Sequence, residues 1–281
     1  MSDTVAIRFS FDGSLEEAQK RLGQLFHVAI QKGTAWDGDD VYFFSSMGMG
    51  VSLFKHKFHD PDHDPRLSDN DVIVQMNLYA PVTGRMYFQV AVLSECASPL
   101  AGMIATDLHC VAYVCSEDDV VLEEVMPDSQ LPKRKVVSTT IQPGGDEALS
   151  RIVRIRFDFD GDLEQARETL GRLFNVEMEK HVSPILDESF SFAAMGVKGT
   201  VSKSFYFDPD LDSRLSHKDV MIDVTLYAPV TNRTASKTDR VLDISSILAS
   251  MVAVCFDRPV YVCSSHNEVI EEVIPTDFDS E

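Results

Sequence analysis

The sequence RFSFDG at residues 8–13 returns as RFDFDG at residues 156–161, which shows that the chain contains an internal repeat. Outward from it, every further match keeps the same offset of 148 residues without a gap. Between residues 5 and 128, 51 of the 124 aligned positions are identical to their counterparts. Other matches are LGQLF at 22–26 with LGRLF at 170–174, LYAPVT at 78–83 and 226–231, and YVCS at 113–116 and 261–264. Self-similarity on this scale indicates a tandem duplication of one domain.

Each copy has the pattern of a domain that mixes strands and helices. In the first copy, residues 5–11 alternate apolar and polar side chains, which predicts a strand, and Ser14 then begins an amphipathic helix. A hairpin is expected from strands at 41–46 and 52–58 around a turn at 47–50. Further strands are predicted at 72–79, 113–115 and 120–125. A second helix is predicted over 98–108, and its counterpart in the second copy is predicted to be longer, over 239–254.

This order of elements predicts the α+β fold class. We expect two tandem copies of a small domain, each an antiparallel sheet packed against two helices, in a pseudo-twofold arrangement like that of a fused homodimer. The first repeat is assigned to residues 1–128 and the second to residues 151–281. Residues 129–150 are interpreted as a polar linker, because they are rich in proline, glycine and polar side chains. The pattern does not predict the order of strands in the sheets.

The charge of the chain is strongly negative. Its 25 Lys and Arg against 45 Asp and Glu give a net charge of −20. The first repeat contributes 8 basic and 20 acidic residues, the linker 3 and 2, and the second repeat 14 and 23, which gives −12, +1 and −9. Such a field repels phosphate backbones and anionic lipid, so neither nucleic acid nor a membrane is expected as partner. A basic protein or a cation fits better, unless the acidity serves solubility alone.

The sequence predicts a cytoplasmic protein. Its N-terminus lacks the basic and then apolar segments of a signal peptide. Five cysteines without paired spacing favour a reducing compartment over a disulfide scaffold. Cys115 and Cys263 occupy equivalent positions in apolar segments and are interpreted as buried residues.

An acidic loop is the sharpest local pattern in each copy. It reads DPDHDPRLSDND at 60–71 and DPDLDSRLSHKD at 208–219. The oxygen-bearing residues at positions 1, 3, 5, 9 and 12 are similar to those of an EF-hand calcium loop. However, Pro65 and Ser213 replace the glycine at position 6, Asp replaces the final Glu, and the flanks are predicted strands. The alternative is a turn or protein-contact loop whose aspartates form Asx-turns and pair with Arg66 or Arg214.

No catalytic residue, metal ligand or cofactor is predicted. His56, His59 and His63 could together suggest a transition-metal site, but the second copy lacks them and strand geometry separates residues three apart. Neither a nucleophile elbow, a phosphate-binding loop nor a zinc-protease motif is present. The chain is therefore predicted not to be an enzyme.

These features favour an acidic binding protein that inhibits a basic protein, most specifically an immunity protein that neutralises a toxin such as a nuclease or deaminase. Two alternatives stay open: a calcium-dependent interaction module that uses the paired acidic loops, and an enzyme with a site between the repeats. Whether the chain is a monomer or a homodimer is also left open. The predicted partner-binding residues are Trp36, Asp60, Asp62, Asp64, Asp208, Asp210 and Asp212.

Overall fold

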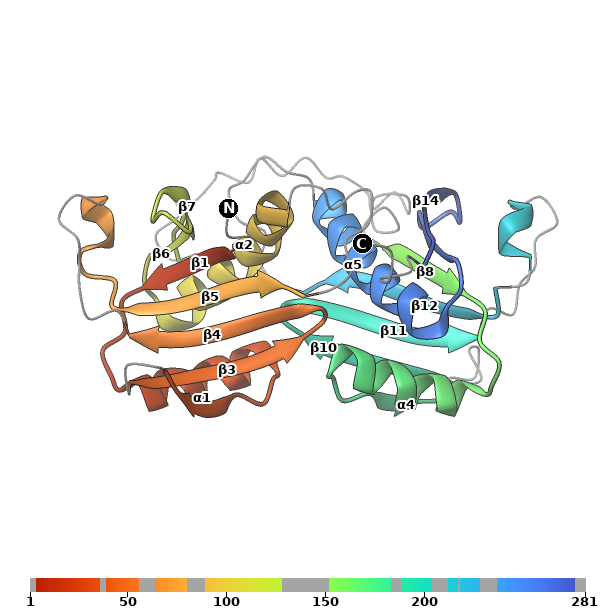
Figure 1. Cartoon of the computed structure of the whole chain (residues 1–281), viewed down its shortest axis with the longest axis horizontal. Helices are drawn as coiled ribbons and strands as arrows, with labels where there is room; N and C mark the ends of the chain where they lie inside the picture. Colours follow the sequence, from red (N-terminus) through yellow and green to blue (C-terminus); the bar gives the residue numbers. More distant parts are fainter. Residues whose placement is uncertain are drawn as a thin grey trace, which may run out of the picture. The chain divides into compact units, whose positions relative to one another are not determined.

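The computed structural model describes residues 4–35, 39–55, 64–79, 89–127, 152–182, 188–203, 212–216, 218–227 and 237–275 (Figure 1), with the backbone alone for 89–92 and 237–240. The chain divides into two compact units, which are described separately. The predicted linker, 129–150, lies outside the described residues. The prediction of an α+β fold with antiparallel sheets is confirmed, because the described residues form two seven-stranded antiparallel sheets and four α-helices.

The described residues of the first unit form seven strands, two α-helices and one short 3-10 helix. In chain order they are β1 (Thr4–Phe9), α1 (Leu15–Phe26), β2 (Gln31–Thr34), β3 (Asp40–Ser46), β4 (Met49–Lys55), η1 (Pro65–Leu67), β5 (Val72–Leu78), α2 (Gln89–Leu108), β6 (Ala112–Ser116) and β7 (Val121–Val125).

The second unit repeats this series. Its elements are β8 (Val153–Phe157), α4 (Leu163–Phe174), β9 (Glu179–His181), β10 (Ser189–Ala194), β11 (Val197–Lys203), η4 (Ser213–Leu215), β12 (Val220–Leu226), α5 (Lys237–Phe256), β13 (Val260–Cys263) and β14 (Val269–Val273).

The two sheets have the same strand order. In the first unit it is β2-β3-β4-β5-β1-β6-β7, and in the second β9-β10-β11-β12-β8-β13-β14. The register is also the same, since Val5 pairs with Met76 in one sheet and Val153 with Val224 in the other. Both sheets place the first strand of the unit near the centre, where it pairs with strands from much later in the sequence.

The backbone repeats its least common conformations at equivalent positions. Four pairs of residues other than glycine have positive φ angles, a conformation that side chains disfavour. Each pair is separated by the offset of the repeat: His27 and Asn175, Met47 and Met195, His109 and Asp257, Asp119 and Asn267. The two units therefore share their turns as well as their strands.

Helix α1 begins where the sequence predicts. The Ser14 hydroxyl accepts a hydrogen bond from the Glu17 amide at 3.1 Å, and the Glu17 carboxylate accepts one from the Ser14 amide at 2.8 Å. This capping box satisfies two donors of the first turn. His27 ends the helix in the left-handed conformation. Ala18, Leu22 and Phe26, spaced four residues apart, are buried.

The β3–β4 hairpin has a shorter turn than predicted. Met47 and Gly48 alone form the turn, both with positive φ, and such two-residue turns match the twist of paired strands. Met49 and Gly50, which were expected in the turn, belong to β4. The short strands β2 and β9 were not predicted, because their residues are polar and exposed and do not alternate.

The second helix of the first unit is longer than predicted. Helix α2 extends over 20 residues rather than 98–108, and α5 also has 20 residues, so the expected difference in length between the copies is wrong. Pro99 lies inside α2. A proline disfavours helical geometry in the residue before it and removes one helical hydrogen bond, which explains why the sequence predicted a later start.

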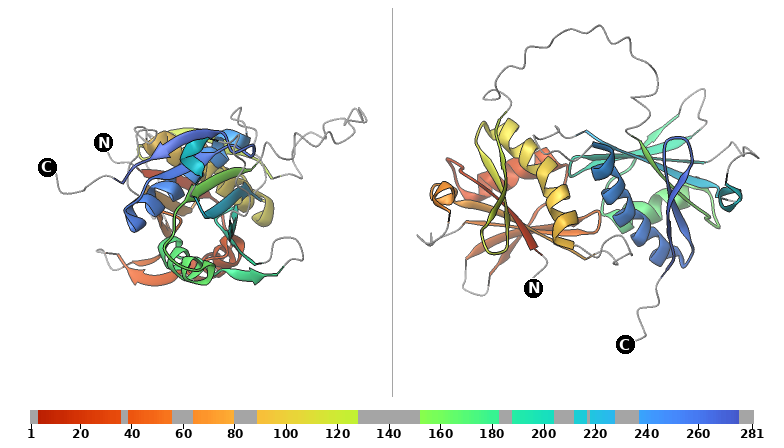
Figure 2. Two further views of the ribbon diagram at one scale, coloured as in Figure 1. Left: turned by 90° about the vertical axis from the view of Figure 1, so that its right-hand side faces the viewer. Right: turned by 90° about the horizontal axis from the view of Figure 1, so that it is seen from above.

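One face of the first sheet forms the main core. Phe44, Val51, Met76 and Val5 face one another across four neighbouring strands, and all four are buried. The Phe26 ring of α1 packs against Phe44, with ring centroids 6.4 Å apart. Helix α2 contacts β1, β5, β6 and β7 of its own unit, and Figure 2 shows it beside the β6–β7 hairpin. The second unit has equivalent contacts between α5 and its strands.

The opposite face of the same sheet has a second, smaller core. Tyr113 and Cys115 lie on this face of β6, and Leu67 of η1 packs onto them. Leu215, Tyr261 and Cys263 form the same cluster in the second unit. The C-terminal part of each acidic loop is therefore anchored on the outer face of its sheet.

Candidate functional site

The candidate site is the C-terminal part of each acidic loop, where it reaches the outer sheet face. Of the seven predicted partner-binding residues, Asp64 and Asp212 lie here. The other five, Trp36, Asp60, Asp62, Asp208 and Asp210, lie outside the described residues, so their role stays a prediction.

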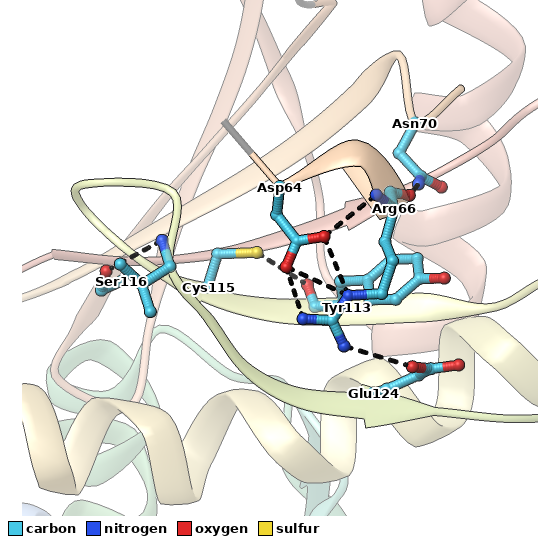
Figure 3. Close-up of polar contacts among 8 residues, drawn as sticks. Asp64, Arg66, Asn70, Tyr113, Cys115, Ser116 and Glu124 are labelled. Atoms are coloured by element: carbon cyan, nitrogen blue, oxygen red, sulfur yellow. Dashed lines mark hydrogen bonds and ion pairs between the residues drawn. The ribbon is translucent and has the colours of Figure 1, made fainter. Parts of the chain in front are cut away.

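Asp64 is bound by the arginine two residues after it. Its carboxylate accepts a hydrogen bond from the Arg66 amide at 3.0 Å, and from Arg66 Nε at 2.9 Å. It also pairs with Arg66 Nη2. Figure 3 shows the guanidinium between Asp64 and Glu124 of β7, whose carboxylate is 3.5 Å from Arg66 Nη1. These bonds form the Asx-turn and the ion pair that the alternative interpretation of the loop expected.

Asp212 repeats this geometry in the second unit. It accepts hydrogen bonds from the Arg214 amide at 3.0 Å and from Arg214 Nε at 2.9 Å, and Arg214 Nη1 is 3.5 Å from Glu272. The Arg214 guanidinium also lies 6.0 Å from the centre of the Tyr261 ring. The arrangement is the same in both units although Pro65 follows Asp64 in one and Ser213 follows Asp212 in the other. It therefore depends on the residues that the two copies share.

The arginine and leucine of the site fix the loop to the sheet. Leu67 is 3% exposed, and Leu215 is 5% exposed. Asn70 donates a hydrogen bond to the Arg66 carbonyl at 2.8 Å, which closes the turn after η1. Sequence reasoning missed the role of the leucines. The available signal was an apolar residue retained in both copies of an otherwise polar loop.

The final aspartate of each loop binds donors of its own unit. Asp71 lies 2.7 Å from Lys55 Nζ and accepts a hydrogen bond from the Phe11 amide at 3.4 Å. Asp219 accepts one from the Phe159 amide at 3.0 Å. The carboxylates at loop positions 5 and 12 are thus engaged with arginine, lysine or backbone donors, whereas an EF-hand loop directs both at a cation.

We expect calcium to leave the stability of the protein almost unchanged, because it would have to displace these donors. Melting temperature in millimolar calcium should match that in chelator. A rise of more than about 5 °C, which corresponds to one or two kcal/mol in a domain of this size, would contradict the expectation.

Acid should weaken the site in a defined range of pH. Hydrogen bonds from the Arg66 side chain and amide lower the pKa of Asp64 from its ordinary 3.8 to about 2, and Arg214 does the same to the pKa of Asp212. Since these pKa values are lowered on folding, the pairs contribute fully above about pH 4 and their contribution is lost as the pH falls to about 2. The test compares the melting temperature of the wild type with that of the double variant Asp64→Asn, Asp212→Asn over this range of pH. The difference should vanish near pH 2, and a constant difference would contradict the assignment.

The cysteines at this face are unsuited to nucleophilic chemistry. Cys115 and Cys263 are fully buried, and burial raises the pKa of their thiols to about 12 and about 11. The thiolate is the reactive form of cysteine, so with these pKa values neither residue is a nucleophile near neutral pH. Within the described ranges, no group of three or more His, Cys, Asp and Glu side chains is placed to hold a metal ion. His56, His59 and His63 lie outside those ranges.

Comparison with known proteins gives no family for this chain. No protein-family model, no curated protein and no solved structure matches it. Among the described helices, none has the length and apolar character needed to cross a bilayer.

Proposed function

We propose that the chain is an acidic binding protein that inhibits a basic protein, most specifically an immunity protein that neutralises a toxin such as a nuclease or deaminase. The observation that carries the proposal is the net charge of −20, to which the two repeats contribute −12 and −9 and the residues between them +1. A toxin that acts on nucleic acid has a positive substrate groove, and carboxylates can take the place of phosphates there. Complementary charge gives rapid association and penalises wrong partners.

Two properties support a role in binding. The buried, high-pKa Cys115 and Cys263 leave no reactive thiolate at the outer sheet face. The anchored ends of the acidic loops, with Leu67 and Leu215 as the apolar contacts, give any loop contact a fixed base on the sheet. A rigid base lowers the entropy cost of association.

The proposal places the protein in the cytoplasm, with the repeats in a pseudo-twofold arrangement. All five cysteines lie in the described residues as free thiols, which suits a reducing compartment. The ungapped duplication and the matching turns of the two units support descent from a homodimer by fusion.

Co-expression tests the function directly. The reading frame immediately upstream should encode a basic protein that arrests growth when expressed alone and is tolerated when co-expressed with this chain. Growth that this chain does not restore, or an upstream product without toxicity, would count against the proposal.

With such a partner available, the acidic loops should control its association rate. Changing Asp60, Asp62 and Asp64 together to Asn should slow association roughly tenfold and flatten its dependence on salt. Asparagine at position 64 keeps an acceptor for the Arg66 amide, so the turn is preserved. The matched change at Asp208, Asp210 and Asp212 is the control, because one repeat is expected to contribute more than the other. If neither variant alters association measured by stopped flow, the loops are not the contact surface.

A further inference from the structure

Exposed apolar side chains gather on one edge strand of each sheet. Ten large apolar residues among the described ones are exposed, and five of them lie within 120–126 and the equivalent 268–274. In or next to β7 they are Val120 (58% exposed), Leu122 (39%) and Met126 (37%). In or next to β14 they are Ile270 (43%) and Ile274 (63%). Single exposed apolar residues are ordinary, but this row contains two positions that stay apolar and exposed in both copies, Leu122 with Ile270 and Met126 with Ile274, which indicates a contact surface.

The backbone of this edge favours contacts through side chains. In the first unit β7 is the last strand of the sheet, and its pairing with β6 shifts between Val114 and Cys115, so Leu122 is an extra residue in the ladder. The second unit has the same irregularity between Val262 and Cys263. A bulge bends an edge strand and interrupts its hydrogen-bonding pattern, which disfavours the addition of a partner strand. Leu122 has no paired residue on β6, and its side chain is 39% exposed.

The surroundings of the row are acidic. The first hairpin, 111–127, contains Glu117, Asp118, Asp119, Glu123 and Glu124 and no Lys or Arg. Asp119 and Glu124 pair with arginines that come from elsewhere in the unit, and both carboxylate oxygens of Glu123 are buried, so these three residues are not part of the rim. Glu117 and Asp118, at the tip, are exposed, and no described residue forms an ion pair with either. A surface with an apolar centre and an acidic rim is complementary to a partner that carries apolar and basic side chains together.

The second hairpin, 259–275, is a weaker version of the first. It contains three acidic residues, Glu268, Glu271 and Glu272, and has no Lys or Arg. Ser265 and His266 replace the acidic tip, and Glu268 replaces Val120. The two copies therefore share a backbone but differ in the features that would attract a basic partner.

We propose that the outer edge of the β6–β7 hairpin in the first unit, formed by Val120, Leu122 and Met126 with Glu117 and Asp118 at its tip, is the surface on which a basic protein with an apolar contact patch docks. The inference rests on the proposed function, and it names a second contact surface in addition to the acidic loops. Apolar contacts at the centre supply most of the affinity, while the acidic tip orients the partner.

The two copies provide matched variants. Glu117→Ser, Asp118→His, Val120→Glu gives the first hairpin three of the four tip residues of the second, and the reciprocal Ser265→Glu, His266→Asp, Glu268→Val does the same for the second hairpin. Asp119 and Asn267 are kept because each binds an arginine of its own unit. Both sets place residues in a backbone that already accommodates them in the other unit, so both variants should fold. The probe is a short synthetic peptide of alternating lysine and leucine, with lysine–serine and glutamate–leucine peptides as controls. Amide NMR shifts of the full chain report the binding site and the affinity.

The lysine–leucine peptide should shift signals at 116–126 most strongly and bind more tightly than either control peptide. The first exchange should weaken binding roughly tenfold, and the reciprocal exchange should create comparable shifts at 264–274. Shifts centred elsewhere would overturn the hairpin assignment and leave the proposed function standing. No binding of either lysine peptide, together with no rescue of growth on co-expression, would overturn both. The variant Lys133→Ser, Arg134→Ser, Lys135→Ser is measured without any peptide. If its amide signals at 116–126 shift as much as those of the wild type with peptide, the chain's own residues 133–135 occupy the surface, and the assignment is overturned.

Discussion

Replacing Leu67 with alanine should lower the free energy of unfolding of the first unit by about 3 kcal/mol, within the range measured when buried leucines are truncated. Leu67 is the apolar residue that η1 contributes to the outer face, where it packs against Tyr113 and Cys115. Its loss leaves a cavity between a short helix and a sheet. Hydrogen exchange at amides of β6 would measure the change, because these protons are exposed only when the cluster opens.

Leu215→Ala provides the matched experiment in the second unit, where the leucine contacts Tyr261 and Cys263. The two variants should destabilise their own units by similar amounts. Leu67→Met, which keeps most of the volume, should cost less than about 1.5 kcal/mol. An alanine variant as stable as the wild type would mean that the loop end is not anchored by this residue.

Replacing Asp119 with alanine should cost about 3 kcal/mol, because it leaves a buried cation without its carboxylate. Arg8 Nη2 lies 2.5 Å from Asp119 Oδ1, and the two side chains are 7% and 17% exposed. Asp119 also has a φ angle of 57°, a conformation that asparagine and aspartate tolerate better than alanine. Urea unfolding followed by the fluorescence of Trp36, the single tryptophan of the chain, would report on the first unit.

Asp119→Asn is the informative control, because the second unit has Asn267 at this position. There, Arg156 Nη2 donates to Asn267 Oδ1 at 2.7 Å, and Arg154 of the same strand pairs with Asp223 at 2.9 Å. The first unit has Ala6 and Gln75 in place of that second pair. The asparagine variant should therefore lose less stability than the alanine variant. Equal losses would show that the charge, and not the hydrogen bond or the turn, accounts for the effect.

Local signals predicted the parts of the fold that are determined locally. The capping residue Ser14 marked the start of α1, and the structure places Asp162 in the same role before α4. The Met47–Gly48 pair marked a hairpin, although two residues of β4 were assigned to the turn. The strand order had no local signal, because β1 pairs with β5 and β6 from distant parts of the sequence.

The remaining differences between the predicted and the observed elements also arise from contacts between segments that are distant in the sequence. Strand β9 contains Glu179, Lys180 and His181, which form a strand only because β10 pairs with them. Helix α2 continues through the region of Pro99, supported by its contacts with four strands. At the candidate site, the sequence predicted the aspartates and arginines of the loop ends. It could not predict the contact between Leu67 and Tyr113, because that contact depends on where the sheet places β6.

The edges of the two sheets have a consequence for the protein at high concentration. An open strand edge can template the growth of aggregates. Here the edge at β2 and β9 is short and carries Lys32 and Lys180, while the edge at β7 and β14 is bulged and carries paired glutamates. Neither offers the long flat surface from which fibrils extend. A cell could therefore accumulate this protein to a high concentration without strand-to-strand aggregation at these edges.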